Sequence, residues 1–143
     1  MFLYMRNERN TKEYSNILTT STKETYDGID SVYCPVLKSK VYFNSIGFRH
    51  LRYKPDGTAR KLVEIIYKMT LFPLAIPSIK NSVGIVDERD INFRVGRKNN
   101  SKIKKAKTFS LVAQVGAKNP VAVRVIILRV GDGKHVFYSI MKD

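Results

Sequence analysis

Residues 41–60 concentrate the side chains that could transfer protons next to an anion. This stretch, VYFNSIGFRHLRYKPDGTAR, contains His50, one of only two histidines among the 143 residues. Four cations accompany it: Arg49, Arg52, Lys54 and Arg60. Histidine is the side chain whose ordinary pKa lies near neutrality, and neighbouring cations lower the pKa of an imidazole. The stretch therefore favours His50 as a general base.

Several other kinds of chemistry are excluded by the absence of their motifs. The sequence has no GxGxxG, no Walker loop, no HExxH and no GxSxG. The two histidines are far apart in sequence, and the twelve acidic residues form no DxD or ExxE cluster in the C-terminal half. A single cysteine, Cys34, excludes an intramolecular disulfide and a cysteine-based zinc site. We therefore expect neither a metal site nor another cofactor.

The charge of the chain favours a polyanionic partner. Twenty-six Lys and Arg against twelve Asp and Glu give a formal charge of +14, and a field of this size attracts nucleic acid first of all. A solubilising surface, or a surface for an acidic protein, would have the same composition. Residues 97–107, RKNNSKIKKAK, are expected to form a basic loop that contacts phosphates. The cations predicted to bind nucleic acid are Arg49, Arg52, Lys54, Arg97, Lys98, Lys102, Lys104, Lys105 and Lys107.

The remaining chemistry is metal-independent cleavage of a phosphodiester. When the 2′-hydroxyl of RNA attacks the adjacent phosphorus, the enzyme needs a proton acceptor, a proton donor and cations near the phosphoryl oxygens. The candidate catalytic residues are His50, Arg60, Lys61, Arg124, Tyr138 and Ser139. Each of them also has an ordinary structural interpretation, as a helix cap, a surface cation or a strand residue. His135, directly after a turn, is expected to be structural.

The elements that must position these residues begin after a polar N-terminal segment. Residues 1–32 are expected to be a loosely ordered extension, and residues 33–143 the folded domain. Residues 32–43 suit one or two short strands. Asn44 or Ser45 can cap a short helical turn over 46–51, and Thr58 can cap a longer helix. The apolar residues of that helix fall at helical spacing: Leu62, Ile65, Ile66, Met69 and Phe72. Its other face carries Lys61, Glu64 and Lys68.

The C-terminal half has the pattern of strands. They are expected at residues 83–86, 91–95, 109–115, 121–130 and 135–141, and the GDGK turn at 131–134 predicts that the last two are antiparallel neighbours. Arg124 interrupts an apolar strand and needs an anion, either a protein carboxylate or a ligand phosphate. The sequence thus predicts an α+β fold, with N-terminal helices packed on one face of a four- to five-stranded antiparallel meander sheet. No run of residues has the length of a membrane span.

The order of these features resembles a known group of nucleases. VYFNSIGFRHL, a turn, an amphipathic helix with a basic head and LFPLAIP, and a final HVFYSI are similar to the barnase, EndoU, colicin and RelE-like (BECR) superfamily, particularly its phage and mobile-element branches. The resemblance covers residues 33–143. It implies RNA cleavage without a metal on a sheet surface, with His50 as base or acid, Arg60 as a phosphate-binding cation, and Tyr138 or Ser139 as the polar group of the last strand. The chain departs from the pattern in lacking a second well-placed histidine, unless His135 serves, and a carboxylate base.

The sequence therefore predicts a metal-independent endoribonuclease, in the role of a toxin or mobile-element effector. Its expected partners are RNA and an acidic inhibitor or immunity protein, with no membrane. Its expected location is the cytoplasm, or the cytoplasm of a target cell. Two alternatives stay open: a non-catalytic nucleic-acid-binding module, and a basic interaction protein that docks an acidic partner.

Overall fold

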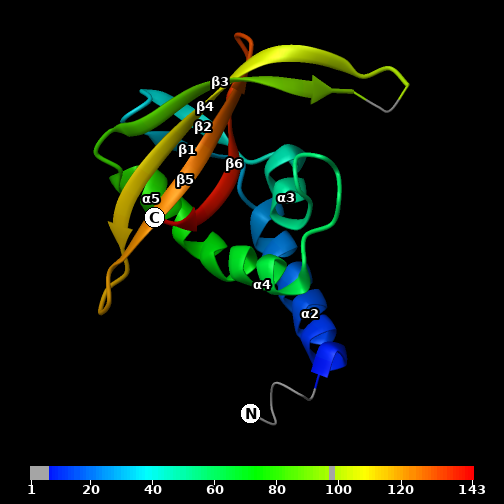
Figure 1. The fold of residues 1–143 in the computed structure, drawn as a ribbon. Helices are drawn as coiled ribbons and strands as arrows, with labels where there is room; N and C mark the ends of the chain where they lie inside the picture. Colours follow the sequence, from blue (N-terminus) through cyan, green and yellow to red (C-terminus); the bar gives the residue numbers. More distant parts are fainter. Residues whose placement is uncertain (1–6, 97–98) are drawn as a thin grey trace.

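A computed structural model describes residues 7–96 and 99–143 of the chain (Figure 1). The elements are, in order, α2 (Asn7–Asp27), β1 (Ser31–Cys34), β2 (Ser39–Tyr42), α3 (Ser45–Arg52), α4 (Leu62–Leu71), the 3₁₀ helix η1 (Phe72–Leu74), α5 (Ala75–Asn81), β3 (Ile85–Val95), β4 (Lys102–Val115), β5 (Val121–Val130) and β6 (His135–Lys142). The predicted α+β class, with helices before a mostly antiparallel sheet, is confirmed.

The sheet contains six strands in the order β1-β2-β6-β5-β4-β3. Every neighbouring pair is antiparallel except β2 and β6, which are parallel over two residue pairs. The predicted count of four to five strands is wrong because the β1–β2 hairpin joins the sheet through this short parallel pairing. The strands expected at 83–86 and 91–95 are one strand, β3. The β5–β6 hairpin is present as predicted, with Gly131 at a φ of 54° in its turn.

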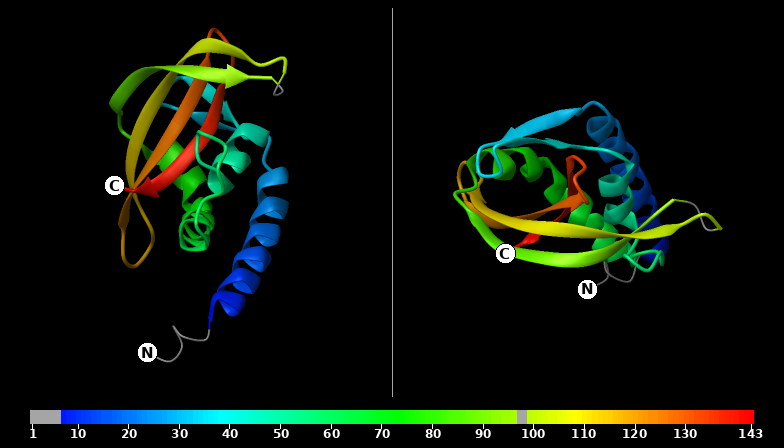
Figure 2. Two further views of the ribbon diagram at one scale, coloured as in Figure 1. Left: turned by 45° about the vertical axis from the view of Figure 1, so that its right-hand side comes forward. Right: turned by 90° about the horizontal axis from the view of Figure 1, so that it is seen from above.

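The main core lies between the helices and one face of the sheet. Figure 2 shows the sheet curving around α5, with α2 running alongside α4. Alternate residues of the strands, such as Phe109, Leu111, Val125 and Phe137, point into this core. The residues between them, Thr108 and Ser110 among them, belong to the opposite face. The opposite face has a second, smaller cluster of buried residues, Ala106, Leu128 and Val136, and leaves the rest of its surface available for a site.

Residues 1–32 are not a loosely ordered extension over the part that the structure describes. Residues 7–27 form the 21-residue helix α2, and residues 1–6 lie outside the described chain. The end of α2 is anchored by Tyr26, which is 2% exposed among the rings of Phe43, Phe48, Phe72 and Phe137. Its hydroxyl donates a hydrogen bond to the Asn44 carbonyl. Small polar residues, Ser15 and Thr22, occupy the other buried positions of the helix, so the apolar periodicity that reveals a helix is weak.

The basic segment 97–107 is only partly a loop. Residues Lys102 to Lys107 belong to β4 and pair with β3 from Val95 to Asp90, so the loop prediction is wrong for them. Arg97 and Lys98 lie outside the described residues. The β3–β4 hairpin projects beyond the helices (Figure 1). Long-range pairing with β3 imposes extended structure on a lysine-rich sequence that has little strand propensity of its own.

The helical stretch Leu62–Asn81 is, among the described residues, the one helix long and apolar enough to cross a membrane by length and composition. The sequence prediction was of no membrane span, because Glu64 and Lys68 interrupt the apolar residues of this stretch. These two charged residues do not greatly lower its average hydropathy. A core helix of a soluble protein meets the same criteria. Here 44% of the most apolar 18-residue window in the stretch is buried, and Met69 and Ile79 belong to the main core.

Gly47 allows α3 to approach β6 closely, and a Gly47→Ala substitution is expected to destabilise the protein. A Cβ at this position would lie 2.5 Å from the Tyr26 hydroxyl oxygen and 2.7 Å from Cδ2 of Phe137. Overpacking of this kind costs about 1–3 kcal/mol of folding free energy. This cost opposes the gain of roughly 1 kcal/mol that alanine, compared with glycine, gives to a helix. We expect a net loss of up to about 2 kcal/mol in chemical denaturation.

Gly84→Ala is the matched control for this substitution. No atom lies within 4 Å of a Cβ built on Gly84, so its free energy of unfolding should change by less than about 0.5 kcal/mol. Equal stability of the two variants would show that α3 does not depend on the small residue at position 47.

Candidate active site

A groove of about 1040 Å³ lies on the sheet face opposite the main core. In the rest of the text "the groove" means this hollow. One wall is α3, the other is β3 from residue 87 onward, and the floor consists of β4, β5 and β6. Four arginines line it: Arg49, Arg89, Arg94 and Arg124. Asp87 is the one acidic lining residue among those that the structure describes, and it is ion-paired with Arg89 at 2.7 Å. The groove is therefore electropositive.

Helix α3 lies along the free edge of β6 because β2 pairs with β6 only as far as Val136. Asn44 caps α3 by accepting a hydrogen bond from the Ile46 amide at 3.0 Å. The buried side of α3 adds Phe48 and Leu51 to the main core. Its other side, which includes His50, faces the groove. One short amphipathic helix thus joins the core to the site.

His50 stacks on the ring of Tyr138 in β6. The ring centroids are 4.0 Å apart with an interplanar angle of 29°, and Phe93 of β3 contacts the Tyr138 ring edgewise at 6.2 Å. Both ring nitrogens of His50 are buried and neither makes a well-formed hydrogen bond in the described part of the chain, although the Tyr138 backbone lies close enough to raise the pKa of the imidazole. Buried polar atoms normally have a partner. The imidazole forms part of the groove wall, but its buried nitrogens reach a ligand only when the side chain turns towards the groove.

The surroundings of His50 keep its imidazole neutral. Burial, and then the positive charges of Arg60 and Lys68, lower the pKa of His50 to about 4, against a weak opposing effect of the Tyr138 backbone. Burial also raises the pKa of Tyr138, with the Arg60 charge acting in the opposite direction. Near neutral pH the site therefore contains a neutral imidazole and a protonated phenol in direct contact.

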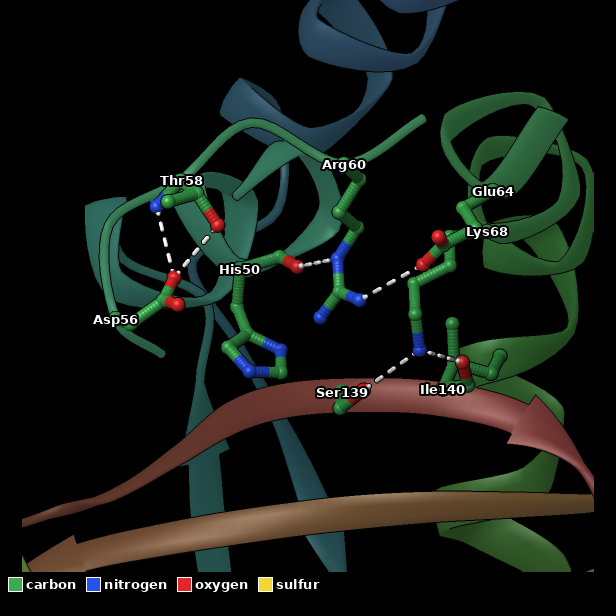
Figure 3. A network of polar contacts seen from close by, with 8 residues as sticks. All are labelled: His50, Asp56, Thr58, Arg60, Glu64, Lys68, Ser139 and Ile140. Carbon is green, nitrogen blue, oxygen red and sulfur yellow. Dashed lines mark hydrogen bonds and ion pairs between the residues drawn. The ribbon is translucent and has the colours of Figure 1, made fainter. Parts of the chain in front are cut away.

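Arg60 is held close to this pair by the backbone of α3. Its side chain is 10% exposed, its Nε donates a hydrogen bond to the His50 carbonyl at 2.9 Å, and its Nη1 lies 3.4 Å from a Glu64 carboxylate oxygen. Figure 3 shows Arg60 between His50 and Lys68, above β6. Arg60 fixes the last turn of α3 and places a positive charge beside the imidazole.

Lys68 is a member of the site that the sequence reading missed. It is 7% exposed, and its Nζ donates hydrogen bonds to the Ser139 hydroxyl at 3.0 Å and to the Ile140 carbonyl at 2.9 Å (Figure 3). Burial and the Arg60 charge lower its pKa to about 8, opposed by Glu64. The prediction that Lys68 lies on the polar face of its helix is wrong. Its position three residues after buried Ile65 was the available signal, because such residues share a helical face.

The other predicted catalytic residues have different surroundings. The Ser139 hydroxyl is engaged by Lys68. Arg124 lines the groove but forms an ion pair with Asp143 at 2.9 Å, so the anion it needs is a protein carboxylate. Lys61 is exposed at the start of α4 and is not part of the groove lining.

Two further predictions concern residues outside the groove. Thr58 does not cap α4, since its hydroxyl donates a hydrogen bond to Asp56 at 2.7 Å. His135 contacts Ser39 of β2 at 3.1 Å through Nδ1.

The predicted nucleic-acid-binding cations lie on two parts of the molecule. Arg49 and Arg52 lie over the ring of Tyr53 in α3 and the following loop, with exposed Lys54 next to them. The described cations of the basic segment are exposed on β4: Lys102, Lys104, Lys105 and Lys107. Strand alternation puts the first two on the same face as Thr108, which lines the groove. Lys107 is ion-paired with Glu88 at 3.3 Å.

Arg89 and Arg94 were not predicted. Both lie on β3, Arg89 between two acidic residues and Arg94 between two apolar ones, and the sequence offered no sign that this strand lies beside the groove. In the described residues, no three His, Cys, Asp or Glu side chains are grouped to hold a metal ion. Comparisons with protein-family models, curated protein sequences and solved structures give no match for this chain.

Proposed function

We propose that the protein is a metal-independent endoribonuclease that cleaves RNA in the groove by attack of the 2′-hydroxyl on the adjacent phosphorus. The observation that supports this most is His50, a neutral imidazole whose ring nitrogens lack a well-formed hydrogen bond, in the wall of an arginine-lined groove. A neutral imidazole can accept a proton, and arginines bind phosphate oxygens.

His50 is the general base in this proposal. Once its side chain has turned to bring a ring nitrogen into the groove, it accepts the proton of the 2′-hydroxyl as the oxygen bonds to phosphorus. An imidazole with a pKa of about 4 is a weak base, but a bound phosphate anion offsets the charges of Arg60 and Lys68 and raises that pKa towards the working pH. Substrate binding thus makes the base stronger at the moment it is needed.

Tyr138 is the proton donor. Its phenol is protonated near neutral pH and is stacked on His50, whereas the hydroxyl of Ser139 is already bonded to Lys68. As the bond from phosphorus to the 5′-oxygen breaks, the phenol gives its proton to that oxygen. The products are a 2′,3′-cyclic phosphate and a 5′-hydroxyl end. The proton held by His50 returns to the phenolate through solvent.

The arginines of the groove and Arg60 supply positive charge where negative charge develops on the phosphoryl oxygens. Arg49 lines the groove on the α3 wall and Arg89, which is ion-paired with Asp87, lines it on the β3 wall, so both walls of the groove carry an arginine. Arg60 is not part of the groove lining, and its Nε donates a hydrogen bond to the His50 carbonyl. It is a positioning residue that also strengthens the local field.

The test is cleavage of a natural RNA in the presence of EDTA, followed by analysis of the ends. We expect cleavage to persist and the products to carry 2′,3′-cyclic phosphate and 5′-hydroxyl ends. A requirement for Mg²⁺, or 3′-hydroxyl and 5′-phosphate ends, would contradict this mechanism. Salt-sensitive binding of RNA without any cleavage would instead identify a nucleic-acid-binding module.

A further inference from the structure

A second hollow, of about 840 Å³, lies between the end of α2 and α3. It adjoins the groove, since Ile46 and Arg49 line both. A third and smaller hollow, of about 360 Å³ near the β5–β6 turn, shares Asn44 and Ile46 with the second. The three hollows are therefore neighbours around the start of α3, and two of them lie away from His50.

The second hollow is marked by two arginines stacked on one tyrosine. The guanidinium carbons of Arg49 and Arg52 lie 4.7 Å and 5.5 Å from the centroid of the Tyr53 ring. Neither has an acidic partner among the residues that the structure describes. The acid that lines this hollow, Asp27, is bound by Lys23 at 2.6 Å. Two guanidinium groups are thus presented without a compensating charge.

We propose that Arg49, Arg52 and Tyr53, here called the platform, bind nucleotides that flank the cleaved phosphodiester in a single strand. Arginine planes backed by an aromatic ring stack on unpaired bases, and their N–H groups bind phosphates. In a duplex the base faces are hidden, so such a platform favours a single strand. Lys134 repeats the arrangement in the third hollow, 4.3 Å from the Tyr42 ring centroid. This inference rests on the proposed function for the strand that occupies the groove.

If the platform binds flanking nucleotides, the affinity of the protein for a single-stranded oligonucleotide should depend on the length of the oligonucleotide. Fluorescence anisotropy of the full chain would use uncleavable 2′-O-methyl oligonucleotides of about three and about ten nucleotides. Tyr53→Leu should weaken binding of the longer strand about tenfold and leave the shorter one unchanged. Tyr53→Phe, which keeps the ring, should bind like the wild-type protein. Arg52→Gln, at an exposed position, should lower the salt dependence by about 0.7 in log Kd per log salt.

Several results would overturn the platform. The first is that Tyr53→Leu and Arg52→Gln both bind the longer strand as tightly as the wild type. The second is that the protein binds a duplex of the same length with equal affinity. The third is that it binds a polyglutamate peptide equally tightly and in a way that depends on Tyr53. The last result would identify a docking surface for an acidic protein. Since the oligonucleotides cannot be cleaved, Tyr53-dependent binding by a protein that does not cut natural RNA would support the platform while contradicting the nuclease proposal.

Discussion

Replacing His50 by glutamine is expected to lower kcat for RNA cleavage by roughly 10²- to 10⁴-fold, the usual contribution of a general base. Glutamine keeps the polarity and much of the volume of the side chain but cannot accept a proton near neutral pH. Proton transfer occurs only in the transition state, so kcat should fall far more than KM changes. Initial rates at saturating and at low concentrations of an RNA oligonucleotide separate the two constants.

His135→Gln is the matched control for this experiment. His135 is the other histidine of the chain, and it contacts Ser39 rather than lining the groove. Its replacement should leave kcat within a fewfold of wild type. A His50→Gln protein that is folded and as active as wild type would exclude the imidazole as the base. A loss of activity only in His135→Gln would move the candidate site to the β2–β6 junction.

The sequence predicted the short helix that carries His50 more accurately than the elements around it. The apposition of His50 and the last strand was expected and is present, because a capped helical turn directly after β2 must pack beside the strand that β2 pairs with. Which residues of that strand matter was not predictable. A register shift in the β5–β6 pairing alters the alternation near Tyr138 and Ser139, and nothing in FYSI announces it.

Tertiary contacts account for the elements that the sequence reading missed. Helix α2 buries Ser15 and Thr22 with the single aromatic residue Tyr26, so its polar sequence resembles an unstructured segment. The β3 wall of the groove depends on pairing with β4 over ten residue pairs. The need of Arg124 for an anion was evident from its apolar strand. Which carboxylate pairs with Arg124 depends on the tertiary fold, which places Asp143 beside it.

Lowering the pH from 6.5 to 4 is expected to reduce the free energy of unfolding by about 2 kcal/mol through His50. The imidazole has a pKa of 6.5 in the unfolded chain and about 4 in the folded protein, so the unfolded state takes up its proton first. The stability is complete above pH 6.5 and is lost as the pH falls towards 4. The full shift corresponds to about 3 kcal/mol, which screening of a partly exposed ring reduces.

Urea unfolding of the wild type and His50→Gln over this pH range isolates the effect, since carboxylates and His135 titrate equally in both proteins. Arg60→Gln removes a charge that lowers the pKa of His50, so its acid sensitivity should be intermediate. Parallel pH profiles for the wild type and His50→Gln would show that the folded imidazole titrates normally. Burial beside two cations keeps His50 neutral, as the proposed catalysis requires, and also makes the fold sensitive to acid. If a folded variant keeps His50 but loses the acid sensitivity of the wild type, the pKa of His50 in that variant should therefore be higher than in the wild type.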